Sequence, residues 1–349
     1  MTENERRILS ELVKASPLSK RDITERCGMG WATAVKLMTR LEEQGYIVPS
    51  GNERQNQAGK SAMVYSLSPS KPVVIGIDIE YARARLNIRN LARECLYENE
   101  RVTPAFPSPD DLVDFLDALL QEAVAKATTT GLSLEGAGIG VPSHLFGIEG
   151  VPYAQIAEKL SSHAGFPVSV DNNIRCFAAG IASLEKPQAS MLVVTIRSGI
   201  GVGIVIDGRI YQGERGCSGE IGHFPVVQDG SRCRCGKTGC LETIVNRDAI
   251  TSMLAAAANG DMEAQIRIDD AAGLFGKAIA TMMLVLDIRR VAIYAELGDL
   301  GKTLLAPVRK AVEDALYPGF DFGISYETLD AEAYVAGAAR LVLDEFVRR

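Results

Sequence analysis

A cluster of soft metal ligands between positions 223 and 240 limits the folding of this chain more than any other local pattern. Three of its seven cysteines, Cys233, Cys235 and Cys240, fall within eight residues, and one of its three histidines, His223, lies just upstream. One imidazole and three thiolates form the tetrahedral ligand set of a closed zinc site, with no position left for water. We therefore expect one structural zinc ion per chain. It would hold together a loop that has too few apolar residues to fold by itself.

Length and composition indicate a cytoplasmic protein of two or three domains. The 349 residues contain no run of 18 or more apolar residues, and the first ten, MTENERRILS, lack the apolar core of a signal peptide. We expect no membrane association. Thiols stay reduced in the cytoplasm, so clustered cysteines there indicate metal binding before disulfides.

Charge is distributed unevenly along the chain. Residues 1–70 carry ten Lys and Arg against eight Asp and Glu, whereas the remainder carries 27 against 36. Only the first segment is electrostatically tolerable beside phosphate groups. The asymmetry is a weak indication of nucleic-acid binding at this end of the chain.

The first 70 residues have the order of a winged helix-turn-helix domain. Apolar residues at helical spacing predict helices over 3–15, 19–28 and 31–45, with Ser19 as N-cap of the second and glycines 28 and 30 in the turn. Two short strands, 46–51 and 62–68, enclose a polar loop that forms the wing. The alternative is a small helical dimerisation module with solvated charges.

In a winged helix the third helix enters the major groove through its N-terminal residues, and the wing approaches phosphate or the minor groove. Trp31 has two interpretations, contact with DNA or packing against a neighbouring subunit or helix. The predicted DNA-binding residues are Trp31, Thr33, Lys36, Arg40, Arg54 and Lys60.

The rest of the chain alternates predicted strands and helices, which is typical of an α/β fold with two lobes and a cleft. A linker over 66–72 contains two prolines and three serines. We expect three domains: a winged helix over 1–70, a small lobe over 71–185 plus 331–349, and a large lobe over 186–330 that contains the zinc motif.

The motif GEIGH at 219–223, followed by CRCGKTGCLE at 233–242, resembles the signature of the ROK family of repressors, open reading frames and sugar kinases. The resemblance extends from the winged helix to the last helix. It implies the two-lobed, ribonuclease-H-like fold of the actin-like ATPases. By the same resemblance, a sugar would be bound by Asn172, Asn173, Glu220, His223 and Glu242, with His223 using one ring nitrogen for zinc and the other for sugar.

Departures from the kinase pattern argue against phosphoryl transfer. Asn173 stands where the kinases have a catalytic Asp, and an amide cannot act as a general base. The first phosphate loop reads Asp-Ile-Glu-Tyr-Ala at 78–82 instead of Asp-x-Gly-Gly-Thr, and the second, at 197–203, keeps only part of its glycines. Pro142-Ser143-His144 replaces the Pro-Gly of the substrate loop.

These observations favour a non-enzymatic transcriptional regulator, a repressor in most of the family, that binds operator DNA and senses a sugar or sugar derivative of carbohydrate metabolism. The resemblance also implies a homodimer or a dimer of dimers. Two alternatives stay open. One is a sugar kinase with an N-terminal extension, and the other is a regulator that responds to a protein partner instead of a sugar.

Overall fold

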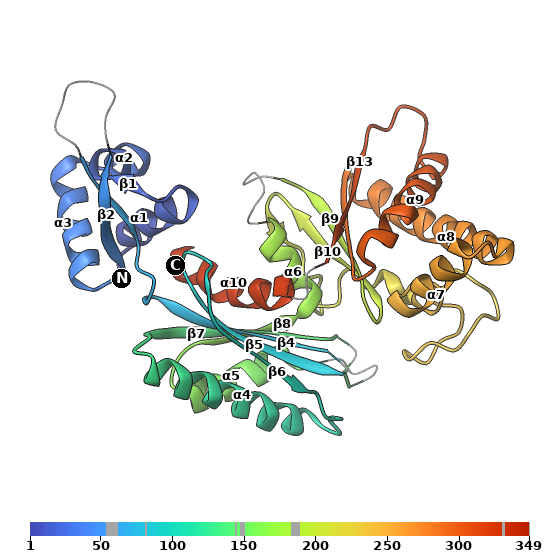
Figure 1. The fold of residues 1–349 in the computed structure, drawn as a ribbon, viewed down its shortest axis with the longest axis horizontal. Coiled ribbons are helices and arrows are strands. Elements are labelled where there is room, and N and C mark those ends of the chain that lie inside the picture. The colour runs from blue at the N-terminus through green and yellow to red at the C-terminus, as the bar shows by residue number, and fades with distance from the viewer. Residues whose placement is uncertain are drawn as a thin grey trace. The chain divides into compact units, whose positions relative to one another are not determined.

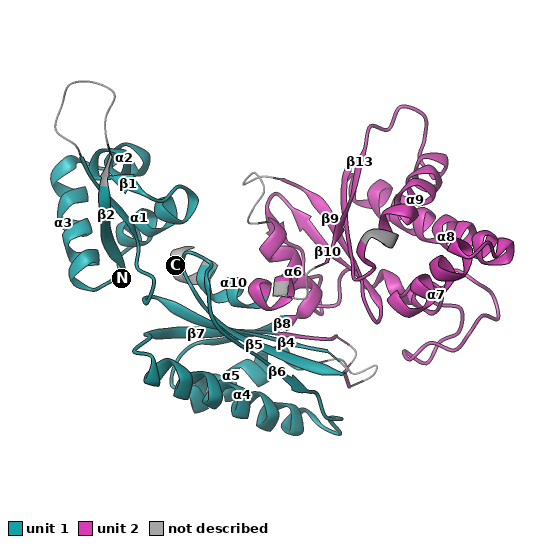
Figure 2. Ribbon diagram, viewed as in Figure 1, with its two compact units in different colours: residues 1–139, 152–171, 338–349 teal, residues 140–151, 172–337 magenta. Residues whose placement is uncertain are grey.

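The computed structural model of the chain describes residues 1–53, 62–80, 82–143, 145–146, 151–182, 189–329 and 332–348. They form two compact units, shown in two colours in Figure 2. The first unit contains residues 1–139, 152–171 and 338–349, and the second contains 140–151 and 172–337. Each unit is built from a mixed or antiparallel sheet and flanking helices (Figure 1), so the predicted α/β class is confirmed.

The N-terminal part of the first unit is a winged helix. Apolar residues at helical spacing, among them Ile8, Leu12, Met38 and Leu41, are fully buried in one core. The hairpin joins a two-residue strand in a three-stranded sheet of order β1-β3-β2. Its elements are α1 (Glu3–Lys14), β1 (Leu18–Ser19), α2 (Lys20–Cys27), α3 (Trp31–Glu43), β2 (Ile47–Glu53) and β3 (Ala62–Leu67).

The remainder of the first unit is a five-stranded sheet of order β6-β5-β4-β7-β8 with helices α4 and α5. Every residue of β4 is buried, including Asp78, and its apolar run over 73–77 predicts a buried strand. Its elements are β4 (Val73–Ile79), β5 (Arg83–Asn90), β6 (Cys95–Val102), α4 (Pro109–Thr129), β7 (Leu134–Val141), α5 (Tyr153–Ala164) and β8 (Val168–Asn172).

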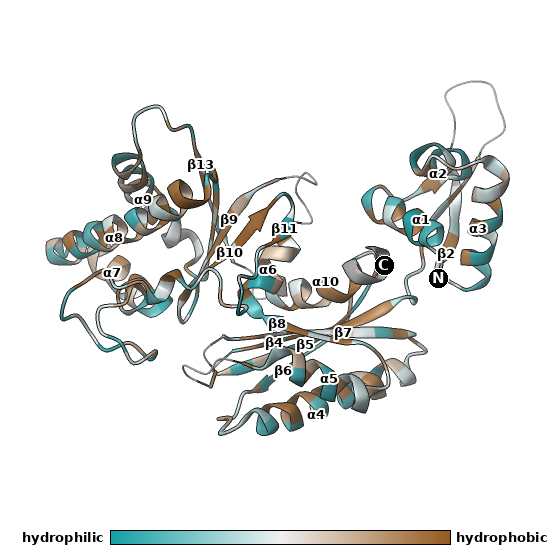
Figure 3. Ribbon diagram, turned by 180° about the vertical axis from the view of Figure 1, so that it is seen from behind, coloured by the Kyte–Doolittle hydropathy of each residue, from teal (hydrophilic) through white to brown (hydrophobic). Residues whose placement is uncertain are grey.

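The second unit contains another five-stranded sheet, with the order β11-β10-β9-β12-β13. This order repeats that of the first sheet, since in each case three strands in an antiparallel meander are extended by two later strands. All six residues of β9 are buried, and β9 and β10 are hydrophobic along most of their length (Figure 3). The strands are β9 (Met191–Ile196), β10 (Ile200–Ile206), β11 (Arg209–Ile210), β12 (Arg290–Ala295) and β13 (Gly323–Thr328).

Helices and short 3₁₀ turns cover this second sheet. Phe275 and Ile279 of α8 are fully buried in the core that α8 shares with α9 and the strands. These elements are α6 (Asn173–Ala182), η2 (Ile221–His223), η3 (Leu241–Thr243), α7 (Arg247–Ala258), α8 (Met262–Leu286), η4 (Gly298–Gly301) and α9 (Lys302–Ala315).

The last helix, α10 (Glu332–Arg348), contributes residues to both units. In the second unit Tyr334 stacks on Phe177 of α6, with ring centroids 4.7 Å apart. In the first unit Val342 and Leu343 belong to the same hydrophobic core as the winged helix. One side of α10 also approaches β7 closely, because a Cβ at Gly138 would overlap the carbonyl oxygen of Ala338.

We predict that Gly138→Ala lowers the free energy of unfolding by about 1–3 kcal/mol or more, because backbone is what its methyl group would meet. The matched control is Gly273→Ala in α8, where nothing lies within 4 Å of the added Cβ. Replacing a glycine inside a helix by alanine should raise stability by about 1 kcal/mol. Urea unfolding followed by circular dichroism measures both changes, and equal midpoints for the two variants would contradict the prediction.

Candidate functional site: recognition helix and metal-ligand cluster

The turn between α2 and α3 is built as the sequence predicts. Ser19 caps α2 through a reciprocal pair of hydrogen bonds: its hydroxyl accepts from the backbone N–H of Asp22 at 3.2 Å, and its own N–H donates to the Asp22 carboxylate at 2.9 Å. Gly28 ends the helix with a left-handed backbone, φ +57°. The cap and the glycine together direct the chain into α3.

The outer face of α3 carries several of the residues predicted to contact DNA. Trp31 is 58% exposed, and Thr33 and Lys36 are exposed beside it. Arg40 is also at the surface, but its Nε lies 3.3 Å from Oε1 of Glu5, whose side chain is fully buried. Arg40 therefore joins α3 to α1 as well as adding charge to the outer face.

The other two predicted DNA contacts, Arg54 and Lys60, lie outside the described residues.

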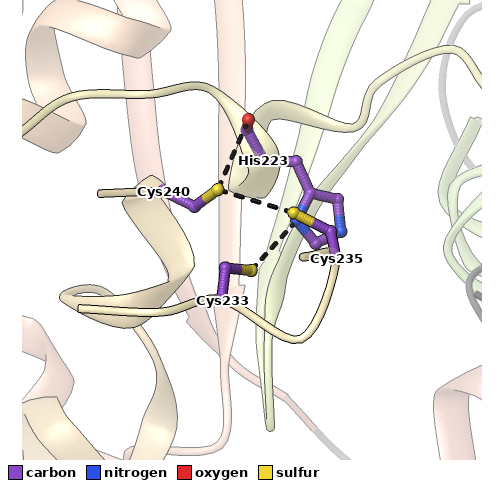
Figure 4. A group of neighbouring side chains, drawn as sticks. All are labelled: His223, Cys233, Cys235 and Cys240. Carbon is purple, nitrogen blue, oxygen red and sulfur yellow. Dashed lines mark hydrogen bonds between the residues drawn. The ribbon is translucent and has the colours of Figure 1, made fainter. Parts of the chain in front are cut away.

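His223, Cys233, Cys235 and Cys240 meet in one cluster, with all four ligand atoms within 4.8 Å of one another (Figure 4). The Sγ atoms of Cys235 and Cys240 are 3.7 Å apart, and Cys233 Sγ lies 3.5 Å from His223 Nδ1. In a tetrahedral site with Zn–S bonds of 2.3 Å, two sulfurs are separated by about 3.8 Å. The donor set and its spacing therefore fit a tetrahedral metal ion.

The chain between the ligands is held by backbone contacts. The N–H of Cys233 donates to the carbonyl of Lys237 at 2.7 Å, which closes the turn that carries Cys235. Gly236 occupies this turn with φ +90°, a conformation that side chains disfavour. Local backbone bonds and a glycine thus position the thiols before any metal binds.

The thiols of the cluster need a cation to become thiolates. Burial raises the pKa of Cys233 and of Cys240, so both thiols hold their protons at neutral pH in the absence of metal. Burial acts in the same direction on Cys235, but a hydrogen bond from the Lys237 backbone helps to outweigh it and lowers the pKa. A bound divalent ion supplies the positive charge that stabilises all three thiolates.

Two carboxylates flank the imidazole of His223 on opposite sides. Its Nδ1 lies 3.7 Å from Oε1 of Glu242, and its Nε2 lies 3.8 Å from Oε2 of Glu220. The Nδ1 atom is also the one that faces the sulfurs. With Nδ1 on a metal, Nε2 would carry the proton toward Glu220, a common carboxylate–histidine–metal arrangement.

Donors of the chain itself already contact both carboxylates. The Ser143 hydroxyl donates to Glu220 Oε1 at 2.5 Å. Arg234 donates to Glu242 through Nε at 2.9 Å and Nη2 at 2.8 Å. Burial acts to raise the pKa of Glu242, but the bonds from Arg234 outweigh it and lower the pKa, so this carboxylate is ionised at neutral pH.

Asn172 and Asn173 stand at the junction of β8 and α6, and both are buried. The side-chain oxygen of Asn172 accepts from the backbone N–H groups of Ile174 at 3.0 Å and Arg175 at 3.1 Å, and so caps α6. This helix packs on β10, against which Gly219 of the GEIGH motif also lies. The structure thus brings all five predicted sugar ligands to the same unit, around β10.

The two loops that correspond to the phosphate loops of the kinases contain Glu80 and Arg197 at positions where the kinase pattern has glycine. Arg197 is 7% exposed, its guanidinium lies 3.7 Å above the ring of Tyr334, and its Nε lies 3.3 Å from Glu296. In the first loop Glu80 lies 3.2 Å from Arg85. Of the other residues named as departures, Tyr81 and His144 lie outside the described residues.

Sequence reasoning missed Ser143 and Arg234 as partners of Glu220 and Glu242, and Arg197 as a partner of Tyr334 and Glu296. Arg197 and Ser143 carried a signal, since each stands where the family pattern has glycine. Arg234 carried none, because its partner is identified only by the folded loop.

Along the described part of the chain, helices fall short of the length and hydrophobicity needed to cross a bilayer.

Comparison with known families agrees with this architecture. Residues 74–345 match the model described as the ROK family. Residues 1–48 match a winged helix-turn-helix DNA-binding model.

Curated relatives include both repressors and kinases. The putative xylose repressor of Caldicellulosiruptor sp. (strain Rt8B.4) is 26% identical over 71% of this chain but only 64% of its own length. The xylose repressor of Caldicellulosiruptor bescii is 21% identical over 97% of this chain and 95% of its own length. The glucokinase of Halalkalibacterium halodurans is 30% identical over 64% of this chain and 83% of its own length.

Among solved structures, a ROK family transcriptional regulator described as a homologue of the E. coli MLC protein matches 99% of this chain and 96% of its own, with a TM-score of 0.79. The sequences are 20% identical. A likeness at this identity concerns the fold, and it includes the winged helix because it covers nearly the whole chain.

Proposed function

The chain belongs to the ROK family, and from that premise we propose that it is a DNA-binding transcriptional repressor whose kinase-like domain binds a sugar or sugar derivative. The observation that carries the proposal is the winged helix. It matches a DNA-binding model over residues 1–48 and exposes Trp31, Thr33 and Lys36 on α3. The similarity to a xylose repressor over 97% of the chain supports it. Such a protein acts on operator DNA in the cytoplasm.

The proposed effector site consists of Asn172, Asn173, Glu220, His223 and Glu242. Carboxylates suit sugar hydroxyls because each oxygen can accept more than one hydrogen bond. The position of both Glu220 and Glu242 beside the His223 ring supports a shared site. A structural zinc ion at His223, Cys233, Cys235 and Cys240 would fix the imidazole between them.

We propose that the protein does not phosphorylate sugar. Asn173 offers no basic atom to a sugar hydroxyl. Arg197 replaces the first glycine of the second phosphate loop, and its guanidinium lies over the ring of Tyr334. Kinase activity is the second candidate function, since the 30% identity to a glucokinase favours it. The same proposal includes three domains, a winged helix over 1–70 and two lobes. It also includes assembly as a homodimer or a dimer of dimers.

We predict that the protein binds a pseudo-palindromic operator and that a monosaccharide effector changes this affinity. Lys36→Ala should weaken binding to all sequences and reduce the salt slope by about one if Lys36 contacts a phosphate. Lys310→Ala in α9, which removes an exposed lysine that does not belong to the winged helix, is the control. Fluorescence anisotropy with genomic fragments, with and without sugars selected by thermal shift, makes the measurement. Purely non-specific binding that moderate salt abolishes would refute the repressor.

We predict one zinc ion per chain. Structural zinc contributes about 10–16 kcal/mol to the folding of small zinc domains, so its removal by a chelator should lower the melting temperature by several degrees. Cys235→Ser should reduce the zinc content, whereas Cys95→Ser, at an exposed cysteine outside the cluster, should not. Metal-free protein with an unshifted melting curve would contradict the assignment.

We predict no ATP-dependent phosphorylation of hexoses or their derivatives in a coupled ADP-release assay. A family glucokinase measured in parallel verifies the assay. Turnover on the order of 1–100 s⁻¹, the range of kinases, would instead support the second candidate function.

A further inference from the structure

Arg234 and Glu242 form a two-point ion pair inside the metal-ligand loop. Arg234 lies between Cys233 and Cys235, and its Nε and Nη2 each donate to a different oxygen of Glu242. This parallel geometry is the strongest that arginine makes with a carboxylate. The proposed function assigns Glu242 to sugar binding. Both of its carboxylate oxygens already accept hydrogen bonds from Arg234.

The two partners differ in what they present to a ligand. The Glu242 side chain is 8% exposed, whereas that of Arg234 is 38% exposed. Of the two partners, Arg234 is thus the one that an incoming molecule can reach. A neutral sugar that needs the Glu242 oxygens must first displace Arg234, which would leave a buried carboxylate without its cation.

The turn between β9 and β10 lies against the same pair. A Cβ at Gly199 would overlap Arg234 Nη2 and would lie 2.7 Å from Glu242 Oε2. Ser198, directly before this glycine, is exposed and adds a hydroxyl donor to the turn. The β9–β10 turn therefore lies close to Arg234.

The opposite side of His223 has a different chemistry. There the Ser143 hydroxyl, a neutral group, donates to Glu220 at 2.5 Å. A sugar hydroxyl can replace one hydroxyl by another without any change in charge. A sugar hydroxyl can therefore replace the Ser143 hydroxyl at Glu220, whereas a ligand near Glu242 meets the cationic Arg234.

We propose that Arg234 is a specificity-determining residue that selects an anionic monosaccharide, one with a carboxylate or a phosphate group, over its neutral counterpart. The planar fork of arginine matches both of these groups in two-point contacts. The inference rests on the proposed function, since it names the chemical class of the effector for the same site.

Isothermal titration calorimetry with D-glucose, D-glucuronate and D-glucose 6-phosphate tests the inference on the full-length protein. We expect one of the two anions to bind wild type at least about tenfold more tightly than D-glucose, the effect of one charge-assisted contact. The two anions distinguish a carboxylate site from a phosphate site. Arg234→Gln should abolish the preference and tighten D-glucose binding, because Glu242 is uncovered.

The matched control is Arg232→Gln, which removes an exposed arginine from the same loop and should keep the preference. Metal content is measured for every variant. If Arg234→Gln loses its metal, Arg234→Lys, which keeps the charge without the fork, should still prefer the anion but by a smaller factor. Equal weakening of D-glucose and the anions in Arg234→Gln would overturn the inference, since Arg234 would then only hold Glu242 in place.

The failure of this inference is distinguishable from failure of the proposed function. If D-glucose or another neutral sugar alters operator affinity equally in wild type and Arg234→Gln, the repressor stands and the anion preference is wrong. If no sugar of either class binds, both are wrong.

Discussion

The close approach of the GEIGH loop to strand β10 is the contact on which the candidate site depends. A Cβ at Gly219 would overlap the carbonyl oxygen of Val202, and Gly219 itself has a left-handed backbone, φ +83°. Three residues later, a Cβ at Gly222 would overlap the carbonyl oxygen of Ile200. Because only glycine permits this backbone contact, Glu220 and His223 are held at a fixed height over the sheet. The metal ligands, the carboxylates and their partners are all placed relative to that point.

The metal-ligand cluster lies in a loop that the hydrophobic core does not hold in place. Cys240 is buried, but Phe224 and Val227 are 51% and 38% exposed, so the loop gains little from hydrophobic burial. Four ligand atoms around one metal ion would replace that missing core. They also connect the loop to the proposed effector site, because His223 belongs to the cluster through one nitrogen and faces Glu220 with the other.

Local signals in the sequence predicted what lies close together along the chain. The spacing of the cysteines predicted the cluster, and the caps and glycines predicted the winged helix, because each is formed by residues a few positions apart. The partners of the site were not predictable in this way. Ser143 and Glu220 are 77 positions apart, and Arg197 and Glu296 are 99 apart, so only the fold brings them together. Helices α7 to α9 were not predicted from the sequence either. In α8, for example, apolar residues are both buried, as Phe275 is, and exposed, as Ile266 is, so the sequence lacks a clear apolar face at helical spacing.

Helix α10 brings residues from the second half of the sequence into the hydrophobic core of the winged helix. The winged helix precedes the other elements in the sequence, and domains generally fold in the order in which they are synthesised. Here its hydrophobic core also includes Val342 and Leu343, which follow the second unit in the sequence. The same helix supplies Tyr334 to the second unit. The core that the winged helix shares with α10 is therefore complete only after the second unit has been translated, so a chain that stops before α10 lacks Val342 and Leu343 in this core.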